Sequence, residues 1–288
     1  MPGHLLLILS PERSGSTLLS VMLGAHRRVL APPELHLLRF PTFETWKSSY
    51  PIAFHSLSAL WQMVGVEDDI ETTCQGRLTV EIYRWLLARC STDQILIDKT
   101  PAYCRSRSSL QRAEQLHPKY LWLVRHPLGV AASRMERRHL KRRKDRSLRG
   151  RLTYPLYALR RAVRGHAGRV SFEVRYWRQV HERIWSFLAE VEPDRWRRAH
   201  FEDLVERPRA EMKRLSDWLG LGLEPSMLQP HEHAPSELQW GLGDGKLLSH
   251  KSIDPAVAHR WRQSLDDSLV DSAARALMEC LGVPRPPV

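Results

Sequence analysis

Residues 10–17, S-P-E-R-S-G-S-T, combine an arginine, a glycine and several hydroxyl side chains, which are residue types that can bind a phosphate group. They follow an apolar run at residues 4–10 and precede residues spaced as on a helix, so they join a strand to a helix. A tight loop with a glycine in this setting aims backbone N–H groups at one point, and Arg13 adds a cation. The lysine of an ATP-hydrolysing P-loop is absent. The segment therefore predicts a phosphate-binding loop, with an ordinary capped turn as the alternative.

A second pair of polar residues follows another apolar run, at residues 120–124. Arg125 leaves the end of this predicted strand with a planar guanidinium that suits phosphate oxygens. Ser133 comes eight residues later, about two helical turns on and on one face. The pair predicts a second anion contact, and a salt-bridged arginine beside a surface serine is the alternative.

These segments resemble the donor-binding motifs of sulfotransferases that use 3′-phosphoadenosine 5′-phosphosulfate (PAPS). Residues 11–19 are similar to that family's 5′-phosphosulfate loop, residues 120–133 to its 3′-phosphate motif, and residues 200–222 to its E-D-L segment. The three blocks follow the order of the family. The resemblance implies a P-loop-like α/β fold, PAPS as donor substrate, adenosine 3′,5′-bisphosphate as product, and no metal.

The resemblance also implies a role for each matching residue. The loop residues that bind the phosphosulfate, with the basic one assisting the leaving oxygen, are Arg13, Ser14, Gly15, Ser16 and Thr17. Arg125 and Ser133 take the 3′-phosphate. Phe201 stands near the adenine, where the family often has a tyrosine; it keeps stacking and lacks the phenol hydrogen bond. Residues 241–251 resemble the loop that closes over PAPS, although they depart from its R-K-G-x-x-G form, and place Lys246 and Lys251 as 3′-phosphate contacts.

Sulfuryl transfer to a hydroxyl needs cations for the sulfuryl oxygens and a base for the acceptor's proton. Glu34 is the leading base, because it lies 21 residues after Arg13, a spacing also seen in tyrosylprotein sulfotransferases. Neighbouring prolines and leucines predict that its pKa is raised towards neutrality. His36 and His250 are further candidates. Lys99 matches a family lysine that neutralises sulfuryl oxygens. An exposed loop glutamate and a surface lysine are the alternatives.

Apolar periodicity locates the elements that must position these residues. Short apolar runs at 4–10, 94–97 and 120–124 predict buried parallel strands. Helical spacing predicts helices over 55–66, 77–90, 105–117, 127–142, 171–191 and 208–219, with Gly220 ending the last. Residues 225–245 predict an extended surface loop. Strands that alternate with helices indicate a P-loop-like α/β fold in one domain, residues 1–288, with a central, mostly parallel sheet flanked by helices.

One segment carries the net charge of +12. Residues 134–178 contain sixteen Arg or Lys and three acids, whereas the remainder holds 28 basic and 29 acidic residues. A generally basic coat for nucleic acid is therefore a poor description of the chain. We expect a basic helical insertion at about 137–170, whose residues 137–151 form a helix extension or a mobile loop. Its possible roles are docking an acidic partner, covering a lipid-like acceptor, contacting a membrane surface, or attracting the anionic donor as a solvated face.

Residues 31–38, A-P-P-E-L-H-L-L, resemble the sulfotransferase domains of modular polyketide synthases. Those domains sulfate a β-hydroxyacyl chain on an acyl carrier protein, which prepares it for release as a terminal alkene. The resemblance implies this acceptor, or another lipid-like or small-molecule alcohol, and an acidic acyl carrier protein as partner. A nucleotide or sugar kinase with an atypical P-loop and a basic nucleic-acid-binding module are the alternative functions.

The four cysteines show neither a C-x-x-C pair nor the dense spacing of a disulfide scaffold. The apolar run near the N-terminus is too short for a signal peptide or a spanning helix. Both features predict a cytoplasmic protein with reduced thiols.

Overall fold

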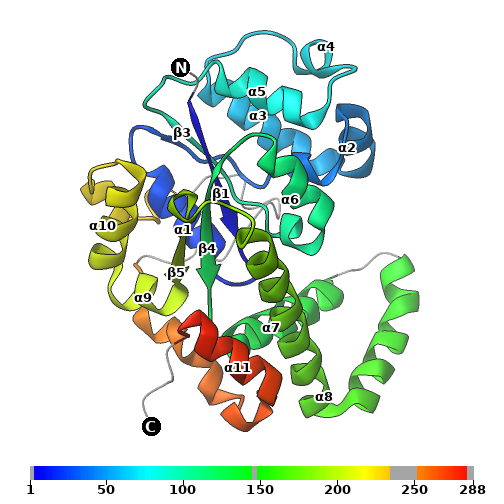
Figure 1. The fold of residues 1–288 in the computed structure, drawn as a ribbon. Helices are drawn as coiled ribbons and strands as arrows, with labels where there is room; N and C mark the ends of the chain where they lie inside the picture. The colour runs from blue at the N-terminus through cyan, green and yellow to red at the C-terminus, as the bar shows by residue number, and fades with distance from the viewer. Residues whose placement is uncertain (1–2, 145–147, 234–251, 284–288) are drawn as a thin grey trace.

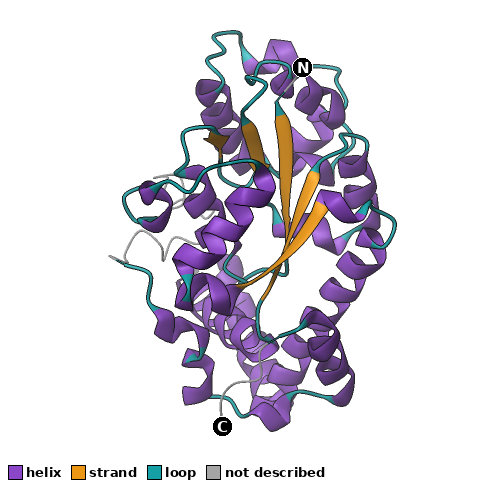
Figure 2. Cartoon of the chain, turned by 60° about the vertical axis from the view of Figure 1, so that its left-hand side comes forward, coloured by secondary structure: helices purple, strands orange, loops and turns teal. Residues whose placement is uncertain are grey.

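A parallel sheet forms the centre of the molecule (Figure 2). The computed structural model describes residues 3–144, 148–233 and 252–283. In these ranges the strand order is β2-β3-β1-β4-β5, and every neighbouring pair is parallel. The strands are β1 (His4–Leu9), β2 (Val29–Leu30), β3 (Ile95–Asp98), β4 (Lys119–Val124) and β5 (Trp196–His200). The chain first builds the sheet on one side of β1 and then crosses to the other, which is the kind of switch point where α/β sheets bind ligands.

Alternate side chains of β1 enter two hydrophobic cores, one on each face of the sheet. Leu5, Leu7 and Leu9 belong to one core, and Leu6 and Ile8 belong to the other. This division follows from the two-residue period of a strand. Because both faces are covered, the strand has an unbroken apolar sequence instead of an alternating one.

Helices cover both faces of the sheet (Figure 1). One core includes side chains of α1 (Ser16–Gly24), α9 (Phe201–Glu206) and α10 (Pro208–Leu219). The other core includes side chains of α2 (Phe43–Ser49), α3 (Phe54–Met63), α4 (Ile70–Cys74), α5 (Thr79–Leu87), α6 (Arg107–Glu114), α7 (Pro127–Lys144), α8 (Leu148–Leu188) and α11 (Ser272–Leu281).

Local chemistry sets several helix ends. The side chain of Thr42 accepts a hydrogen bond from the backbone of α2, and Asp69 and Asp271 do the same for α4 and α11. Such capping satisfies N–H groups that have no partner inside the helix. Gly220 ends α10 in the left-handed conformation, with φ of 71°, as its position predicts.

The predicted fold class is confirmed. The runs at 4–10, 94–97 and 120–124 correspond to β1, β3 and β4, and the six predicted helices overlap α3, α5, α6, α7, α8 and α10. The sequence does not predict the edge strand β5. Its residues, W-R-R-A-H, lack an apolar run, because side chains at the edge of a sheet are only partly buried and can be polar. The short helices α2, α4 and α9, and α11 near the C-terminus, are likewise found only in the structure.

The basic segment is largely helical. α7 continues to Lys144, so the residues from 137 onward extend this helix, and α8 begins at Leu148. α8 is broken at Gly165, where φ is 61°, so the helix predicted over 171–191 forms its second half. Of the predicted loop at 225–245, Pro225–Leu228 form a 3₁₀ turn and residues 234–245 lie outside the described ranges.

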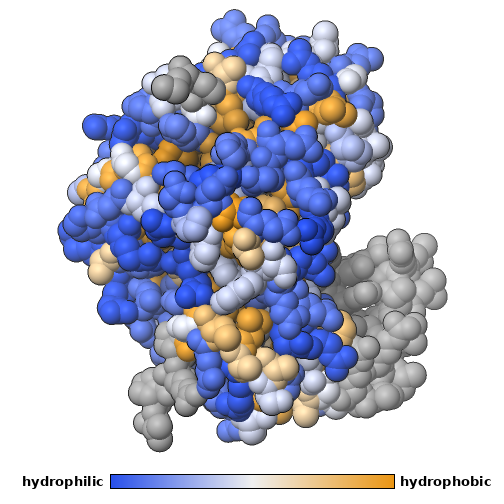
Figure 3. Space-filling view, viewed as in Figure 1, coloured by the Kyte–Doolittle hydropathy of each residue, from blue (hydrophilic) through white to orange (hydrophobic). Residues whose placement is uncertain are grey.

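Hydrophilic side chains cover most of the surface seen in Figure 3, with apolar side chains in small groups between them. Within the described residues, no helix combines the length and apolar character that crossing a membrane requires.

Candidate active site

The carboxyl ends of three neighbouring strands bring the predicted site residues together. The parallel register pairs Leu7 of β1 with Asp98, the last residue of β3, and Leu9 with Trp122 of β4. The chain therefore leaves all three strands at the same edge of the sheet. A cavity of about 1000 Å³ lies there, lined by the loop after β1, the segments after β3 and β4, and the turns at residues 252–264.

The loop after β1 has the geometry of an anion-binding turn. Arg13 and Gly15 adopt left-handed backbone conformations, with φ of 73° and 90°, and α1 begins at Ser16. The hydroxyls of Ser10 and Ser14 are buried and have no hydrogen-bond partner in the described part of the chain. Buried hydroxyls are rarely left unpaired. The loop therefore suits a ligand that brings its own oxygen atoms, as a phosphosulfate does.

The ring of Phe201 packs against Gly15 of this loop. A Cβ atom at Gly15 would lie 2.2 Å from Cδ2 of the Phe201 ring, so only glycine fits there. The guanidinium of Arg125 lies 4.1 Å from the centroid of the same ring, a cation–π contact. Phe201 begins α9 directly after β5, which explains how a residue so distant in sequence reaches the loop.

Arg13, Arg125 and Ser133 form one hydrogen-bonded group. Nε of Arg13 donates to Oγ of Ser133 at 3.0 Å. Arg125 donates from Nη1 to the carbonyl of Arg13 and from Nη2 to the carbonyl of Val257, both at 3.1 Å. Ser133 lies in the second turn of α7. The two predicted anion contacts thus belong to one site.

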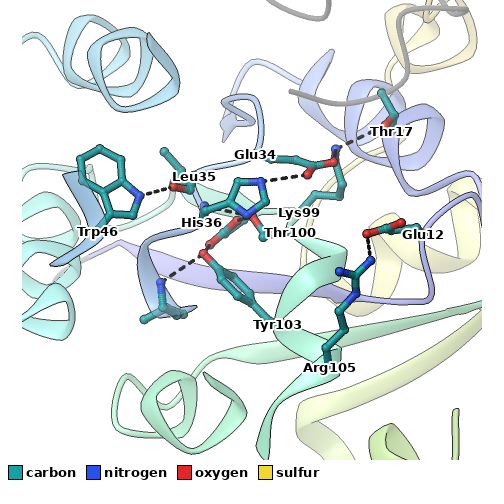
Figure 4. Close-up of polar contacts among 12 residues, drawn as sticks. Glu12, Thr17, Glu34, Leu35, His36, Trp46, Lys99, Thr100, Tyr103 and Arg105 are labelled. Atoms are coloured by element: carbon teal, nitrogen blue, oxygen red, sulfur yellow. Dashed lines mark hydrogen bonds and ion pairs between the residues drawn. The ribbon is translucent and has the colours of Figure 1, made fainter. Parts of the chain in front are cut away.

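A second group at the cavity contains Thr17, Glu34 and His36, which line it, and Lys99, which joins them from inside the protein (Figure 4). Nζ of Lys99 donates to Oε1 of Glu34 at 2.8 Å and to Oγ1 of Thr17 at 3.3 Å. Nε2 of His36 lies 3.2 Å from Oε2 of Glu34. The Lys99 side chain is 2% exposed and that of Glu34 is 18% exposed. Lys99 therefore links the donor loop to the carboxylate from inside the protein.

The pKa of Glu34 differs from the sequence-based expectation. Burial acts to raise this pKa, but the Lys99 ammonium and His36 outweigh it and lower the pKa to about 2. The predicted rise towards neutrality is therefore wrong. The apolar residues next to Glu34 in sequence give no sign that Lys99, which follows β3, lies beside the carboxylate. At neutral pH the carboxylate is ionised, and it is a weak base while Lys99 pairs with it.

Three predicted residues lie outside the described ranges. His250, Lys246 and Lys251 belong to residues 234–251, so their roles stay predictions.

Two aromatic residues of the cavity have no counterpart in the sequence-based expectation. The ring of Tyr50 packs against that of His36, with centroids 4.1 Å apart and planes tilted by 37°, and burial raises the pKa of the Tyr50 phenol. Trp261 stacks on His126 at 4.4 Å, and its buried Nε1 has no hydrogen-bond partner among the described residues. Both residues lie in turns far from the recognised motifs, and no local pattern marks them.

Glu12 anchors the donor loop to its surroundings. Its carboxylate pairs with Arg105 and, at 2.8 Å, with Nη1 of Arg134 on α7. Arg134 in turn pairs at 2.7 Å with Glu173 on α8, and both of these side chains are buried. Glu12 therefore has a structural contact that the motif alone does not indicate.

The arrangement defines a class of group-transfer enzyme. Arg13, Lys99 and Arg125 provide cations around a loop suited to an anion, and an ionised carboxylate lies beside them. Transfer of a charged group from an anionic donor requires stabilised oxygens, a stabilised leaving group and a base.

Comparison with known proteins identifies the family. A model described as the sulfotransferase family matches residues 6–225, so the chain belongs to that family. The sulfotransferase domain from the Synechococcus PCC 7002 olefin synthase is 28% identical, with a TM-score of 0.77 over 99% of this chain and 96% of that domain. The sulfotransferase domain from the curacin biosynthetic pathway is 27% identical, with a TM-score of 0.75 over 99% of each chain. No curated protein matches the chain. The predicted enzyme class is confirmed, and it displaces the kinase and nucleic-acid-binding alternatives.

Proposed function

We propose that this sulfotransferase moves the sulfuryl group of PAPS to the hydroxyl of an acceptor. The observation that carries the proposal is the position of Lys99, whose Nζ contacts both Thr17 of the donor loop and the carboxylate of Glu34. One ammonium between a phosphosulfate loop and a carboxylate matches the charge requirements of sulfuryl transfer.

The donor would lie at the carboxyl edge of the sheet, with its phosphosulfate at the loop after β1 and its 3′-phosphate at the segment after β4. Arg13 and the loop groups of Ser14, Gly15, Ser16 and Thr17 would hold the phosphosulfate, and the unpaired hydroxyls of Ser10 and Ser14 support this assignment. Arg125 and Ser133 would hold the 3′-phosphate, with Phe201 bordering the adenine. Lys246 and Lys251 are proposed as further 3′-phosphate contacts.

In the transfer itself, the acceptor oxygen attacks sulfur while the sulfur–oxygen bond to the phosphate breaks. The bonding electron pair leaves with adenosine 3′,5′-bisphosphate, and the acceptor's proton goes to the base. We assign Glu34 as that base and Lys99 as the cation for the sulfuryl oxygens. An ammonium that turns towards the sulfuryl oxygens loosens its hold on Glu34 and so raises the carboxyl pKa. His36, 3.2 Å from Glu34, and His250 are the other candidates for this role.

The proposed acceptor is a β-hydroxyacyl chain on an acidic acyl carrier protein. Similarity to sulfotransferase domains of an olefin synthase and of the curacin pathway supports this acceptor. Arg105, Arg137 and Arg138 line the cavity and would attract an anionic partner. We propose that residues 1–288 form a single domain. The helical insertion at about 137–170 would be the element on which the acyl carrier protein docks.

Ligand-dependent melting tests the donor assignment. Adenosine 3′,5′-bisphosphate without Mg²⁺ should stabilise the protein by about 3 kcal/mol at a hundredfold excess over Kd. ATP with Mg²⁺ should give a much smaller shift. Arg125→Ala should lose the shift, whereas the control Arg207→Ala, at an exposed i,i+4 ion pair with Asp203, should keep it. Equal stabilisation by ATP with Mg²⁺, or none by the bisphosphate, would contradict the proposal.

A further inference from the structure

A buried carboxylate lies directly behind the Glu34–Lys99 pair. Asp98, the last residue of β3, is 1% exposed and immediately precedes Lys99. Its Oδ2 accepts hydrogen bonds from the hydroxyls of Tyr83 and, at 2.7 Å, Tyr103, and its Oδ1 accepts one from Thr100 at 2.8 Å. All three donors are neutral, and each is at most 1% exposed.

Two of these hydroxyls continue to the segment that carries Glu34. Tyr103 Oη accepts a hydrogen bond from the backbone N–H of Leu38 at 3.3 Å, and Thr100 Oγ1 accepts one from the N–H of His36 at 3.4 Å. Figure 4 shows Thr100 beside His36 and Tyr103 below it. Trp46 completes the support, because its Nε1 donates to the carbonyl of Leu35 at 2.8 Å.

When Asp98 is ionised, its charge gives these contacts a fixed direction. An ionised carboxylate only accepts hydrogen bonds, so the hydroxyls of Tyr103 and Thr100 must give it their protons. Each hydroxyl then presents a lone pair to a backbone N–H of residues 34–38. An amide in place of the carboxylate could itself donate a hydrogen bond to these hydroxyls, so the direction of the contacts would no longer be fixed.

The arrangement is costly if its only purpose is stability. Burial raises the pKa of Asp98, and a buried carboxylate held by neutral donors is poorly compensated for the loss of water. Apolar residues of similar shape would fill the same space at less cost. The segment it restrains is also strained, since His36 adopts a left-handed backbone with φ of 57°.

We propose that Asp98 is a positioning residue for sulfuryl transfer, which holds Glu34 against Lys99, and His36 beside Glu34, through Tyr103 and Thr100. This role rests on the proposed function. Asp98 fixes Lys99 through the chain itself and fixes residues 34–38 through the two hydroxyls. The geometry of both partners of the ion pair is thus set from one buried point.

Two tyrosines that bind the same oxygen provide a matched test. Tyr103→Phe breaks the connection to Leu38, whereas Tyr83→Phe removes a hydroxyl whose described contacts do not include residues 34–38. Both changes remove one buried hydroxyl and should lower the melting temperature similarly. Tyr103→Phe should lower kcat roughly tenfold to a hundredfold with donor KM nearly unchanged, because small misplacements of catalytic groups have effects of this size. Tyr83→Phe should keep kcat within about twofold.

The pH profile adds a readout that a purely structural role would leave unchanged. Among the residues that the structure describes, the titratable groups that face Glu34 are Lys99, His36 and Tyr50. If Glu34 moves away from Lys99, the pKa of Glu34 rises, so the acidic limb of kcat/KM should move to higher pH in Tyr103→Phe and stay in place in Tyr83→Phe.

Thr100→Val is a second variant, for use if Tyr103→Phe fails to fold. It leaves the N–H of His36 without its hydroxyl acceptor and should reproduce the Tyr103→Phe pattern.

Equal kcat values and equal pH profiles for folded Tyr103→Phe and Tyr83→Phe, in an active wild-type background, would overturn the positioning role alone. Absence of sulfuryl transfer by the wild-type chain would overturn the proposed function and this role with it. The two failures are therefore distinguishable in one series of assays.

Discussion

The donor side and the base side of the cavity are held by different kinds of contact. On the donor side, Arg13, Arg125 and Ser133 lie within motifs at the ends of adjacent strands and bind one another directly. On the base side, the backbone N–H groups of His36 and Leu38 donate to the hydroxyls of Thr100 and Tyr103, which are distant in sequence. From this difference we expect the donor side to determine donor affinity and the base side to determine turnover. Substitutions on the two sides should therefore separate KM from kcat.

Lys99→Ala should have the largest effect. Loss of this ammonium would remove the proposed cation for the sulfuryl oxygens, so kcat should fall about a thousandfold, with the affinity for adenosine 3′,5′-bisphosphate changed only a few-fold. Steady-state kinetics with calorimetric binding measures both. The control Lys213→Ala, at an exposed i,i+4 pair with Asp217, should retain activity. A kcat within tenfold of wild type would remove Lys99 from the transfer step.

Glu34→Gln should lower kcat about a hundredfold or more, because general-base catalysis typically contributes that much. Bisphosphate affinity should stay near the wild-type value. Glu190→Gln, an exposed partner of Arg107, serves as the control. Wild-type turnover in Glu34→Gln would transfer the role of base to His36 or His250.

Arg125→Ala should show the opposite pattern. Charge-assisted hydrogen bonds contribute about 1.5–3 kcal/mol each, so donor KM should rise roughly a hundredfold while kcat at saturation changes only a few-fold. A loss confined to kcat would erase the distinction between the two sides.

Acid unfolding should reveal the low pKa of Glu34 as the smallest effect. Its pKa is about 2 in the folded chain against an ordinary value of 4.5. Ionised Glu34 therefore stabilises the fold fully above pH 4.5, and this contribution is lost as the pH falls towards 2. In urea titrations, the stability advantage of wild type over Glu34→Gln should shrink between about pH 6 and about pH 3. An advantage that is independent of pH would contradict the Lys99–Glu34 pairing.

The sequence predicts the donor side better than the base side for a physical reason. Residues 10–17 and the pair Arg125–Ser133 follow unbroken apolar strands, and parallel strands bring their carboxyl ends to one edge. Glu34 could be selected from its spacing to Arg13, but its pKa depends on Lys99 across β3, which no local pattern shows. Asp98 is adjacent to a predicted residue, yet its two tyrosine partners come from α5 and from the turn Pro101–Arg105.

The missed strand β5 and the two aromatic residues of the cavity share a cause. β5 lies at the sheet edge with half-buried side chains, so its sequence lacks the apolar run that marks β1, β3 and β4. Trp261 and Tyr50 reach the cavity from turns whose positions depend on tertiary packing. Local sequence cannot report a position that distant elements determine.

Transfer of labelled sulfur tests the central claim most directly. The purified chain would be incubated with PAPS labelled in its sulfuryl group and with a β-hydroxyacyl chain on an acyl carrier protein, beside simple alcohols. We predict that an acceptor gains the mass of one SO₃ group with the label, that bisphosphate appears in equal amount, and that Lys99→Ala slows both about a thousandfold. Failure of every hydroxyl acceptor to take up label, with bisphosphate release independent of acceptor, would contradict the account.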